Sequence, residues 1–202
     1  MKIAHIFLRI AALFSFILFI LLLNFRFYVY NLDFYEHEFQ KLGVYDTIDR
    51  DIALVQTKNL FNFFKTGEFS DVTYFNEKEM LHLRDVYVLI HRTIFLFYVV
   101  SAVLFFLFFM FRRLLAKVFI VGGASLFILV ILLSLPDFGL LFVFFHKIAF
   151  ANELWLLNPE TDNLINLFPV QFFYDFVKKI FFNSGIIGLL FVCWGFFLRR
   201  RE

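Results

Sequence analysis

Four stretches of this chain are apolar and long enough to cross a lipid bilayer, which limits the folds the chain can adopt. They cover residues 3–25, 92–111, 116–135 and 180–198. A bilayer core of about 30 Å requires roughly 20 apolar residues in a helix, because each residue adds about 1.5 Å. The chain is also 62% hydrophobic, whereas soluble domains are about 45–50% apolar. The sequence therefore predicts an all-α integral membrane protein with four transmembrane helices.

The first stretch could instead be a secretion signal. Its apolar run, however, exceeds the roughly 7–15 residues of a signal's hydrophobic region, and residues 24–28 form no small-residue cleavage site. We expect it to remain as an uncleaved helix. Residues 1–202 are then expected to form a single membrane domain.

Basic residues predict how the helices are oriented. They gather at the N-terminus, in the turn at 112–117 and at the C-terminal end, 199–201. The loop at about 31–86 holds six Lys/Arg against eleven Asp/Glu, and the loop at about 136–176 holds one Lys against five Asp/Glu. Because Lys and Arg beside a span stay in the cytoplasm, both termini are predicted inside and both acidic loops outside.

Both outer loops contain helix signals. In the first loop, residues 45–64 have helical apolar spacing, and Gly67 can end that helix. The next helix starts with a capping box, in which Asn76 caps the helix and Glu79 reaches back to it. No Gly or Pro follows as far as Arg112, so this helix is predicted to run directly into the second span.

The second loop contains two further predicted helices. Residues 138–150 are apolar but too short to span, which is typical of a re-entrant or interfacial segment. Residues 164–179 have aromatic and charged side chains spaced as in a helix that lies at the membrane surface.

Several classes of protein are excluded by composition. Cys193 is the single cysteine, so there is no internal disulfide and no cysteine metal cluster. Cys193 lies close to Arg199 and is expected to have a packing role. The net charge of +2 is scattered and predicts no nucleic-acid partner. The common serine-hydrolase, zinc-protease and phosphate-loop motifs are absent, so in any acyl transfer the nucleophile must come from substrate or water.

Three of the five histidines have ordinary explanations. His5 is expected at the cytoplasmic interface. His37 lies among carboxylates in a solvated loop. His91 is expected to anchor its helix in the outer headgroups.

His82 and His146 are the candidates for chemistry. A helix turns about 100° per residue, so His82 and His91 point about 180° apart, whereas Asp85 shares the face of His82. A carboxylate there could fix the tautomer of a general base, or the pair could be incidental on a solvated face. His146 lies in an apolar run, where an ionisable group predicts a functional site. The alternative is a histidine satisfied by a backbone carbonyl.

Two segments resemble the bacterial lipoprotein intramolecular transacylases. They are 145–169 (FHKIAFANELWLLNPETDNLINLFP) and 79–86 (EMLHLRDV). The longer segment is fairly specific and the shorter one is weak alone. The resemblance extends over essentially the whole chain. Members of this family move the sn-2 acyl chain of a diacylglyceryl-cysteine onto that cysteine's own α-amine, which gives a lyso-form lipoprotein.

The resemblance implies roles for individual residues. His82 and His146 match the two catalytic histidines, and the supporting candidates are Asp85, Asn152, Trp155 and Asp162. Apart from the resemblance, Trp155 would be a belt aromatic and 158–162 an ordinary turn. At position 158 the family pattern predicts Asp, so Asn158 leaves any charge role there open.

The implied reaction needs no cofactor, because the substrate brings its own nucleophile. The expected partners are diacylglyceryl-modified lipoproteins and membrane lipid. We expect a monomer in the bacterial cytoplasmic membrane, with its site facing outside.

Two alternatives remain open from the residues alone. A metal-dependent membrane hydrolase could use His82, His146, Asp85 and Glu77 as ligands, and metal analysis of the purified protein would distinguish it. A non-catalytic membrane protein would use the loops only for binding, and alanine at either histidine would then leave its function intact.

The predicted orientation can be tested by cysteine labelling. Cysteines placed at Lys41 and Asn163 should react with an impermeant thiol reagent in whole cells, because both loops are predicted outside. A cysteine at Arg201 should not react. Labelling at Arg201 alone would reverse the orientation and move every candidate site residue to the cytoplasm.

Overall fold

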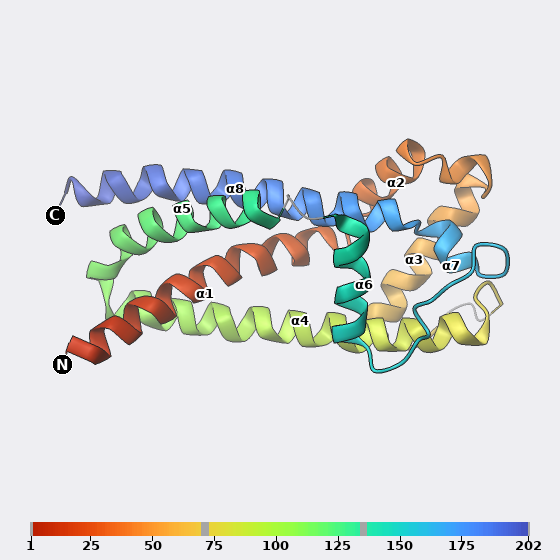
Figure 1. Ribbon diagram of the computed structural model, residues 1–202, viewed down its shortest axis with the longest axis horizontal. Helices are drawn as coiled ribbons and strands as arrows, with labels where there is room; N and C mark the ends of the chain where they lie inside the picture. The colour runs from red at the N-terminus through yellow and green to blue at the C-terminus, as the bar shows by residue number, and fades with distance from the viewer. Residues whose placement is uncertain (1, 70–72, 134–136, 202) are drawn as a thin grey trace. The chain divides into compact units, whose positions relative to one another are not determined.

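The computed structural model describes residues 2–69, 73–133 and 137–201, and the regular elements in these ranges are all helical (Figure 1). The all-α prediction is therefore confirmed. In chain order the elements are α1 (Lys2–Tyr28), α2 (Leu32–Lys41), η1 (Val44–Asp46), α3 (Arg50–Thr66), α4 (Glu77–Met110), η2 (Arg112–Leu114), α5 (Leu115–Leu133), α6 (Phe138–Ala149), α7 (Asn163–Leu167) and α8 (Val170–Arg199).

Four of these helices, α1, α4, α5 and α8, are long and apolar enough to cross a membrane. Each contains one of the predicted spans or most of it. Residues 134–136, where we placed the end of the third span and the start of the second outer loop, lie outside the described residues. At 12 residues, α6 is a short apolar helix, as its sequence predicted.

The chain divides into two compact units, and α4 and α8 contribute residues to both. The first unit comprises Met1–Phe27, Thr93–Pro136 and Lys178–Glu202. Its core joins α1, α4 and α5, with Phe16 packed between Phe119 at 5.5 Å and Phe191 of α8 at 5.1 Å between ring centroids.

Close helix contact and a buried hydrogen bond stabilise this first unit. A Cβ on Gly123 would lie 2.4 Å from the carbonyl oxygen of Gly188, so α5 and α8 approach each other as only glycine allows. The Asn24 amide donates to the Ile20 carbonyl at 3.0 Å and to Ser184 Oγ at 3.1 Å. The buried amide of Asn24 is thereby satisfied inside an apolar helix.

The second unit comprises Tyr28–Arg92 and Asp137–Val177, and aromatic rings form its core. Tyr35 of α2 lies 4.9 Å from Phe61 of α3 and 4.9 Å from Phe172 of α8, measured between ring centroids. Phe39 of α2 lies 5.5 Å from Phe168. These contacts hold the start of α8 and the residue before it against α2 and α3.

The first outer loop differs from its prediction in two ways. The expected helix at 45–64 begins only at Arg50, because the Asp49 side chain accepts from the N–H groups of Asp51 and Ile52 and caps the helix there. Gly67 ends it in a left-handed conformation with φ of 80°, as predicted. The helix α2 was not predicted, although Asn31 caps it by accepting from the Phe34 N–H.

The second outer loop also requires a correction. The single surface helix expected at 164–179 is divided, because Pro169 disfavours helical backbone at Phe168 and ends α7 at Leu167. From Val170 no proline interrupts the chain, and α8 continues as one helix of 30 residues to Arg199. The fourth span and the predicted surface helix are therefore largely one element.

The capping box predicted for the second span is confirmed. The Glu79 N–H donates to Asn76 Oδ1 at 3.0 Å, and the Asn76 N–H donates to Glu79 Oε2 at 2.7 Å. Glu79 also accepts from the N–H of Leu164 at the start of α7. This fully buried carboxylate, whose pKa burial raises above its ordinary value, therefore joins α4 to α7.

Removal of the Glu79 carboxylate should destabilise the protein. Glu79→Ala leaves the buried N–H of Leu164 and the part-buried N–H of Asn76 without their acceptor, and a buried unsatisfied group costs about 1–3 kcal/mol. For a chain of this size, about 1 kcal/mol lowers the thermal midpoint by roughly 2–4 °C. Glu77→Ala, at an exposed neighbouring carboxylate, is the control. Equal thermal midpoints of the two variants in detergent would contradict this role.

Candidate functional site

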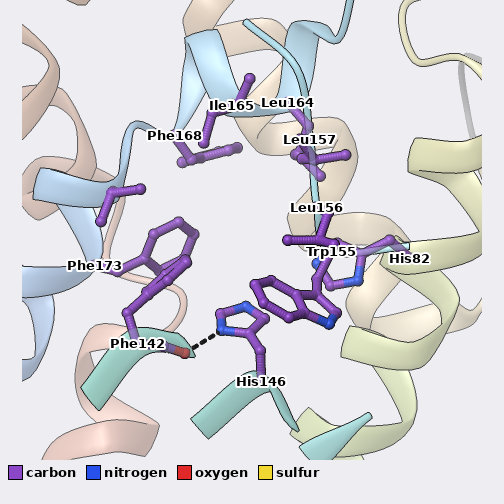
Figure 2. A pocket seen from close by; sticks show the side chains of 11 residues that line it. His82, Phe142, His146, Trp155, Leu156, Leu157, Leu164, Ile165, Phe168 and Phe173 are labelled. Carbon is purple, nitrogen blue, oxygen red and sulfur yellow. Dashed lines mark hydrogen bonds between the residues drawn. The ribbon is translucent and has the colours of Figure 1, made fainter. Parts of the chain in front are cut away.

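The structure brings together the two histidines that the sequence singled out. His82 lies on α4, before the predicted span begins at residue 92, and His146 lies on α6. Their ring centroids are 6.3 Å apart, and the ring planes make an angle of 34°. Both side chains are buried, with 7% and 8% of their surface exposed. One substrate group can therefore contact both rings (Figure 2).

Both imidazoles line one cavity of about 190 Å³ within the second unit. The wall is built from α4, α6, the segment 155–157, α7 and the start of α8, as Figure 2 shows. Of its eleven lining residues, the two histidines are the only ones with a titratable side chain. The lining residues are His82, Phe142, His146, Trp155, Leu156, Leu157, Leu164, Ile165, Phe168, Val170 and Phe173.

A backbone hydrogen bond fixes the tautomer of His146. Its Nδ1 lies 2.7 Å from the carbonyl oxygen of Phe142, one helical turn earlier (Figure 2). Because a carbonyl only accepts, Nδ1 carries the hydrogen and Nε2 keeps its lone pair. Burial lowers the pKa of His146, although this hydrogen bond opposes the shift. The backbone contact that we considered as an ordinary explanation for His146 also prepares the ring to act as a base.

His82 is held neutral by its surroundings. Burial, and next the nearby His146, lower the pKa of His82 to about 4, while Asp85 opposes the shift. Its buried Nδ1 has no hydrogen-bond partner among the described residues. Buried polar atoms are nearly always hydrogen-bonded in folded proteins, so this nitrogen is available to a bound molecule.

Aromatic rings enclose the imidazole of His146. Trp155 lies against it in a tilted arrangement, with centroids 4.8 Å apart and an interplanar angle of 32°. Phe142 lies 4.2 Å from the same ring. Phe150 contacts both histidines, at 5.6 Å from His146 and 5.2 Å from His82. These rings exclude water from one side of the site and restrict the rotation of both imidazoles.

Polar contacts attach the segment around Trp155 to the first turns of α4. The Asn152 amide donates to Asp85 Oδ2 at 2.9 Å, and Lys78 Nζ donates to the carbonyl oxygen of Leu156. Asp162 accepts from the Asn76 amide at 2.8 Å. Three of the four supporting candidates, Asp85, Asn152 and Asp162, therefore help to hold the cavity wall in place.

Hydrogen bonding keeps Asp162 ionised. Its carboxylate accepts from the Asn158 N–H at 2.7 Å, and this bond, more than those from Asn76 and Thr161, lowers its pKa. The side-chain oxygen of Asn158 accepts from the Glu160 N–H at 3.0 Å. Either Asn or Asp can make that turn contact, so the geometry at position 158 requires no charge.

Of the two interpretations considered for Asp85, the one in which it fixes the tautomer of His82 is wrong. No hydrogen bond joins the two side chains in the described part of the chain, because Asp85 accepts from Asn152 instead. The tautomer of His82 is therefore not set by Asp85.

Sequence reasoning also missed the apolar lining residues on α7 and α8, since nothing distinguishes them from other apolar residues before the chain is folded.

The remaining histidines and the cysteine lie elsewhere. His91 is exposed, and its Nδ1 lies 3.0 Å from the Tyr87 carbonyl oxygen, while His37 is exposed on α2. The side chain of His5 lies outside the described part of the structure. Cys193, which we expected to have a packing role, is exposed on α8, where lipid rather than protein would surround it.

The metal-ligand set considered from the sequence is not assembled. Among the described residues, no group of three or more His, Cys, Asp or Glu side chains lies close enough to hold a metal ion. In particular, Glu77 and Asp85 do not line the cavity that holds the two histidines.

Comparison with known proteins identifies relatives of this chain. The family model of the lipoprotein intramolecular transacylase Lit matches residues 10–173. The structure of the membrane-integral transacylase Lit from Bacillus cereus superimposes with a TM-score of 0.86 at 20% identity, over 100% of both chains. Two structures of single-histidine variants of that protein, with arginine and with alanine, each give 0.83 at 20% identity, over 96% of this chain and 92% and 93% of theirs. No curated protein matches the chain.

His82 should remain neutral in mildly acidic solution. In protein with ¹⁵N-labelled histidine, the imidazole of His82 should keep the shifts of the neutral ring at pH 6, where a free imidazole of pKa about 6.5 is mostly charged. The imidazole of His146 should titrate at lower pH than a free imidazole, because burial lowers its pKa. Because the folded pKa of His82 is below the unfolded value, the free energy of unfolding should decrease as pH falls from about 6.5 toward 4. Each imidazole signal is assigned by its disappearance from the spectrum of the His82→Asn or the His146→Asn variant. Protonation of His82 near pH 6.5 would show that its burial is incomplete.

Proposed function

This chain belongs to the lipoprotein intramolecular transacylase family, and on that premise we propose that it moves the sn-2 acyl chain of a lipoprotein's diacylglyceryl-cysteine onto the α-amine of the same cysteine. The chain is a multi-pass integral membrane acyltransferase. The observation that carries the proposal is the pair of buried, neutral imidazoles at one apolar cavity. None of the eleven lining residues is a serine or cysteine, which supports the proposal that the substrate amine is the nucleophile.

The proposed reaction is balanced without a cofactor. The α-amine nitrogen attacks the carbonyl carbon of the sn-2 ester, and a C–N bond forms as the C–O bond to glycerol breaks. The amine loses one proton and the released glycerol oxygen gains one. The product contains an amide and a free sn-2 hydroxyl, and no water is consumed.

The two imidazoles have different roles in this scheme. His146 accepts the amine proton at Nε2, because its Nδ1–H is already donated to the Phe142 carbonyl. It then returns this proton to the leaving glycerol oxygen. His82 stays neutral and donates a hydrogen bond to the carbonyl oxygen as negative charge develops there. A preorganised donor in a dry site is an effective stabiliser of such an oxyanion.

Trp155 supports the base in this scheme. When His146 accepts the proton it becomes an imidazolium, and the adjacent face of Trp155, 4.8 Å away, attracts a cation through its π-electrons. Burial disfavours that charge, so the attraction of the Trp155 ring offsets part of the free-energy cost of charging His146. Trp155 is therefore proposed as a positioning residue.

Holding amine and ester in one molecule supplies much of the acceleration. An oriented intramolecular reaction gains up to roughly 7–11 kcal/mol over its bimolecular counterpart. Acid–base assistance by the histidines adds about 10²–10⁴-fold. The site is proposed to face outward, as the distribution of Lys and Arg predicts, where lipoproteins present their lipidated N-termini.

Alanine at either site histidine should reduce turnover strongly. With a synthetic diacylglyceryl-cysteine peptide that has a free amine, His82→Ala and His146→Ala should each lower the rate of lyso-product formation by about 10²-fold or more. His91→Ala is the control, because His91 is exposed and does not line the cavity. Product is measured by mass spectrometry. Full activity of either site variant, or equal loss in all three, would contradict the assignment.

The same measurement can be made in cells. Mass spectrometry of lipoprotein N-termini, with and without expression of this protein, should show the N-acylated lyso-form only when the active protein is present. Unchanged N-termini would contradict the proposed reaction.

A further inference from the structure

Most of the wall of the cavity beside the histidines is apolar, although proton transfer itself involves only the two imidazoles. Beyond the two imidazoles its wall is formed by leucine, isoleucine, valine, phenylalanine and tryptophan side chains. In Figure 2 the labelled Leu164, Ile165 and Phe168 lie on the opposite side of the cavity from His146. The cavity therefore extends from the reactive groups toward α7.

This lining is chemically suited to hydrocarbon. Of its eleven side chains, only the imidazoles and the Trp155 indole carry a polar atom. A phosphate, a sugar or a peptide bond placed toward α7 would exchange its hydrogen bonds to water for contacts with apolar side chains, which disfavours its binding there. The cavity thus selects a ligand with an ester near the histidines and a hydrocarbon chain beyond it.

We propose that the cavity binds the first part of the migrating acyl chain, next to the ester carbonyl, and that Phe168 with Leu164 forms the floor that limits how many of its carbons the cavity encloses. The identity of the ester rests on the proposed function. A cavity of about 150 Å³ encloses one benzene molecule, so the present volume of about 190 Å³ holds roughly six to eight carbons.

The floor is rigid enough to select a length. Phe168 is buried and contacts Phe39 at 5.5 Å, Tyr35 at 6.0 Å and Phe172 at 5.4 Å between ring centroids. Leu164 is also buried, and Glu79 accepts a hydrogen bond from its N–H. Neither residue can move aside without disrupting the aromatic core of the second unit or the start of α4.

The rim of the cavity is apolar and exposed. Leu156 has 49% of its surface exposed, and Val170 and Phe173 are exposed beside the cavity. In a longer acyl chain, the carbons beyond about the eighth leave the cavity across these side chains. Only the enclosed carbons then contribute to selectivity, and each enclosed methylene contributes about a fourfold preference, equivalent to about 0.8 kcal/mol.

A chain-length series tests this arrangement. Substrates share one peptide and one sn-1 chain, and the sn-2 chain varies from four to sixteen carbons. For the unsubstituted protein, kcat/KM should rise about fourfold per methylene to about eight carbons and then level. Phe168→Ala and the milder Phe168→Leu should move the levelling point to longer chains, and Ile165→Phe should move it to shorter ones. Phe144→Ala, at a residue that is 64% exposed on α6 and outside the cavity, should leave it unchanged.

A binding measurement separates this inference from the proposed reaction. The chain has two tryptophans, so in a Trp194→Phe background the fluorescence reports Trp155 in the cavity wall. Methyl 8-bromooctanoate should quench this fluorescence, and the filling variant Ile165→Phe should weaken the quenching severalfold.

The outcomes are distinct. Levelling points that do not move in any cavity variant would overturn the acyl-chain floor, while formation of lyso-product would leave the proposed function intact. Quenching that depends on Ile165, without lyso-product from any substrate, would support the hydrocarbon cavity and reject the proposed function. Quenching that is equal in the Ile165→Phe variant would overturn the cavity assignment.

Discussion

The buried carboxylate of Glu79 is the interaction on which the geometry of the site depends. It satisfies the N–H of Asn76 at the start of α4 and that of Leu164 at the start of α7. A buried backbone N–H that lacks an acceptor is costly, so these two helix starts are held together. One of them leads to His82, and the other carries the side chains that face it across the cavity. The Glu79 side chain, which helps to cap α4, therefore also joins α4 to the distant start of α7.

Burial has two opposite consequences for the histidines. It removes water and holds His82 neutral, with a pKa of about 4, so that the ring can donate or accept a hydrogen bond without carrying charge. It also makes a positive charge on His146 costly. The hydrogen bond to the Phe142 carbonyl favours the charged imidazole, and the Trp155 ring, 4.8 Å away, is proposed to do the same. The site therefore combines an apolar lining, suited to hydrocarbon, with a backbone contact that favours charge on one imidazole.

Local signals predicted some helix ends correctly, whereas the caps at Asn31 and Asp49 and the break at Pro169 were not recognised from the sequence. The Asn76–Glu79 capping box and Gly67 predicted two ends that the structure confirms. Pro169 was overlooked in the predicted helix at 164–179, although proline at that position explains why α7 ends and α8 begins. The helix α2 was missed because its buried aromatic residues resemble those of a surface loop until α3 and α8 cover them.

What the sequence determined by itself is the set of four apolar helices, the start of α4 and the choice of His82 and His146 as the candidate site histidines. These depend on properties that act over a few residues or one helix length: hydropathy, side-chain caps and the chemistry of imidazole. Only the tertiary structure decided that Asp85 accepts from Asn152 rather than pairing with His82, that Trp155 lies against His146, and that Phe168 lines the cavity. The Asp85–Asn152 contact joins segments 67 residues apart, and the cavity wall combines residues from 82 to 173, whereas Trp155 meets His146 through the way the chain turns after α6. Local spacing contains no information about which distant face a side chain will meet, because that depends on how the helices pack.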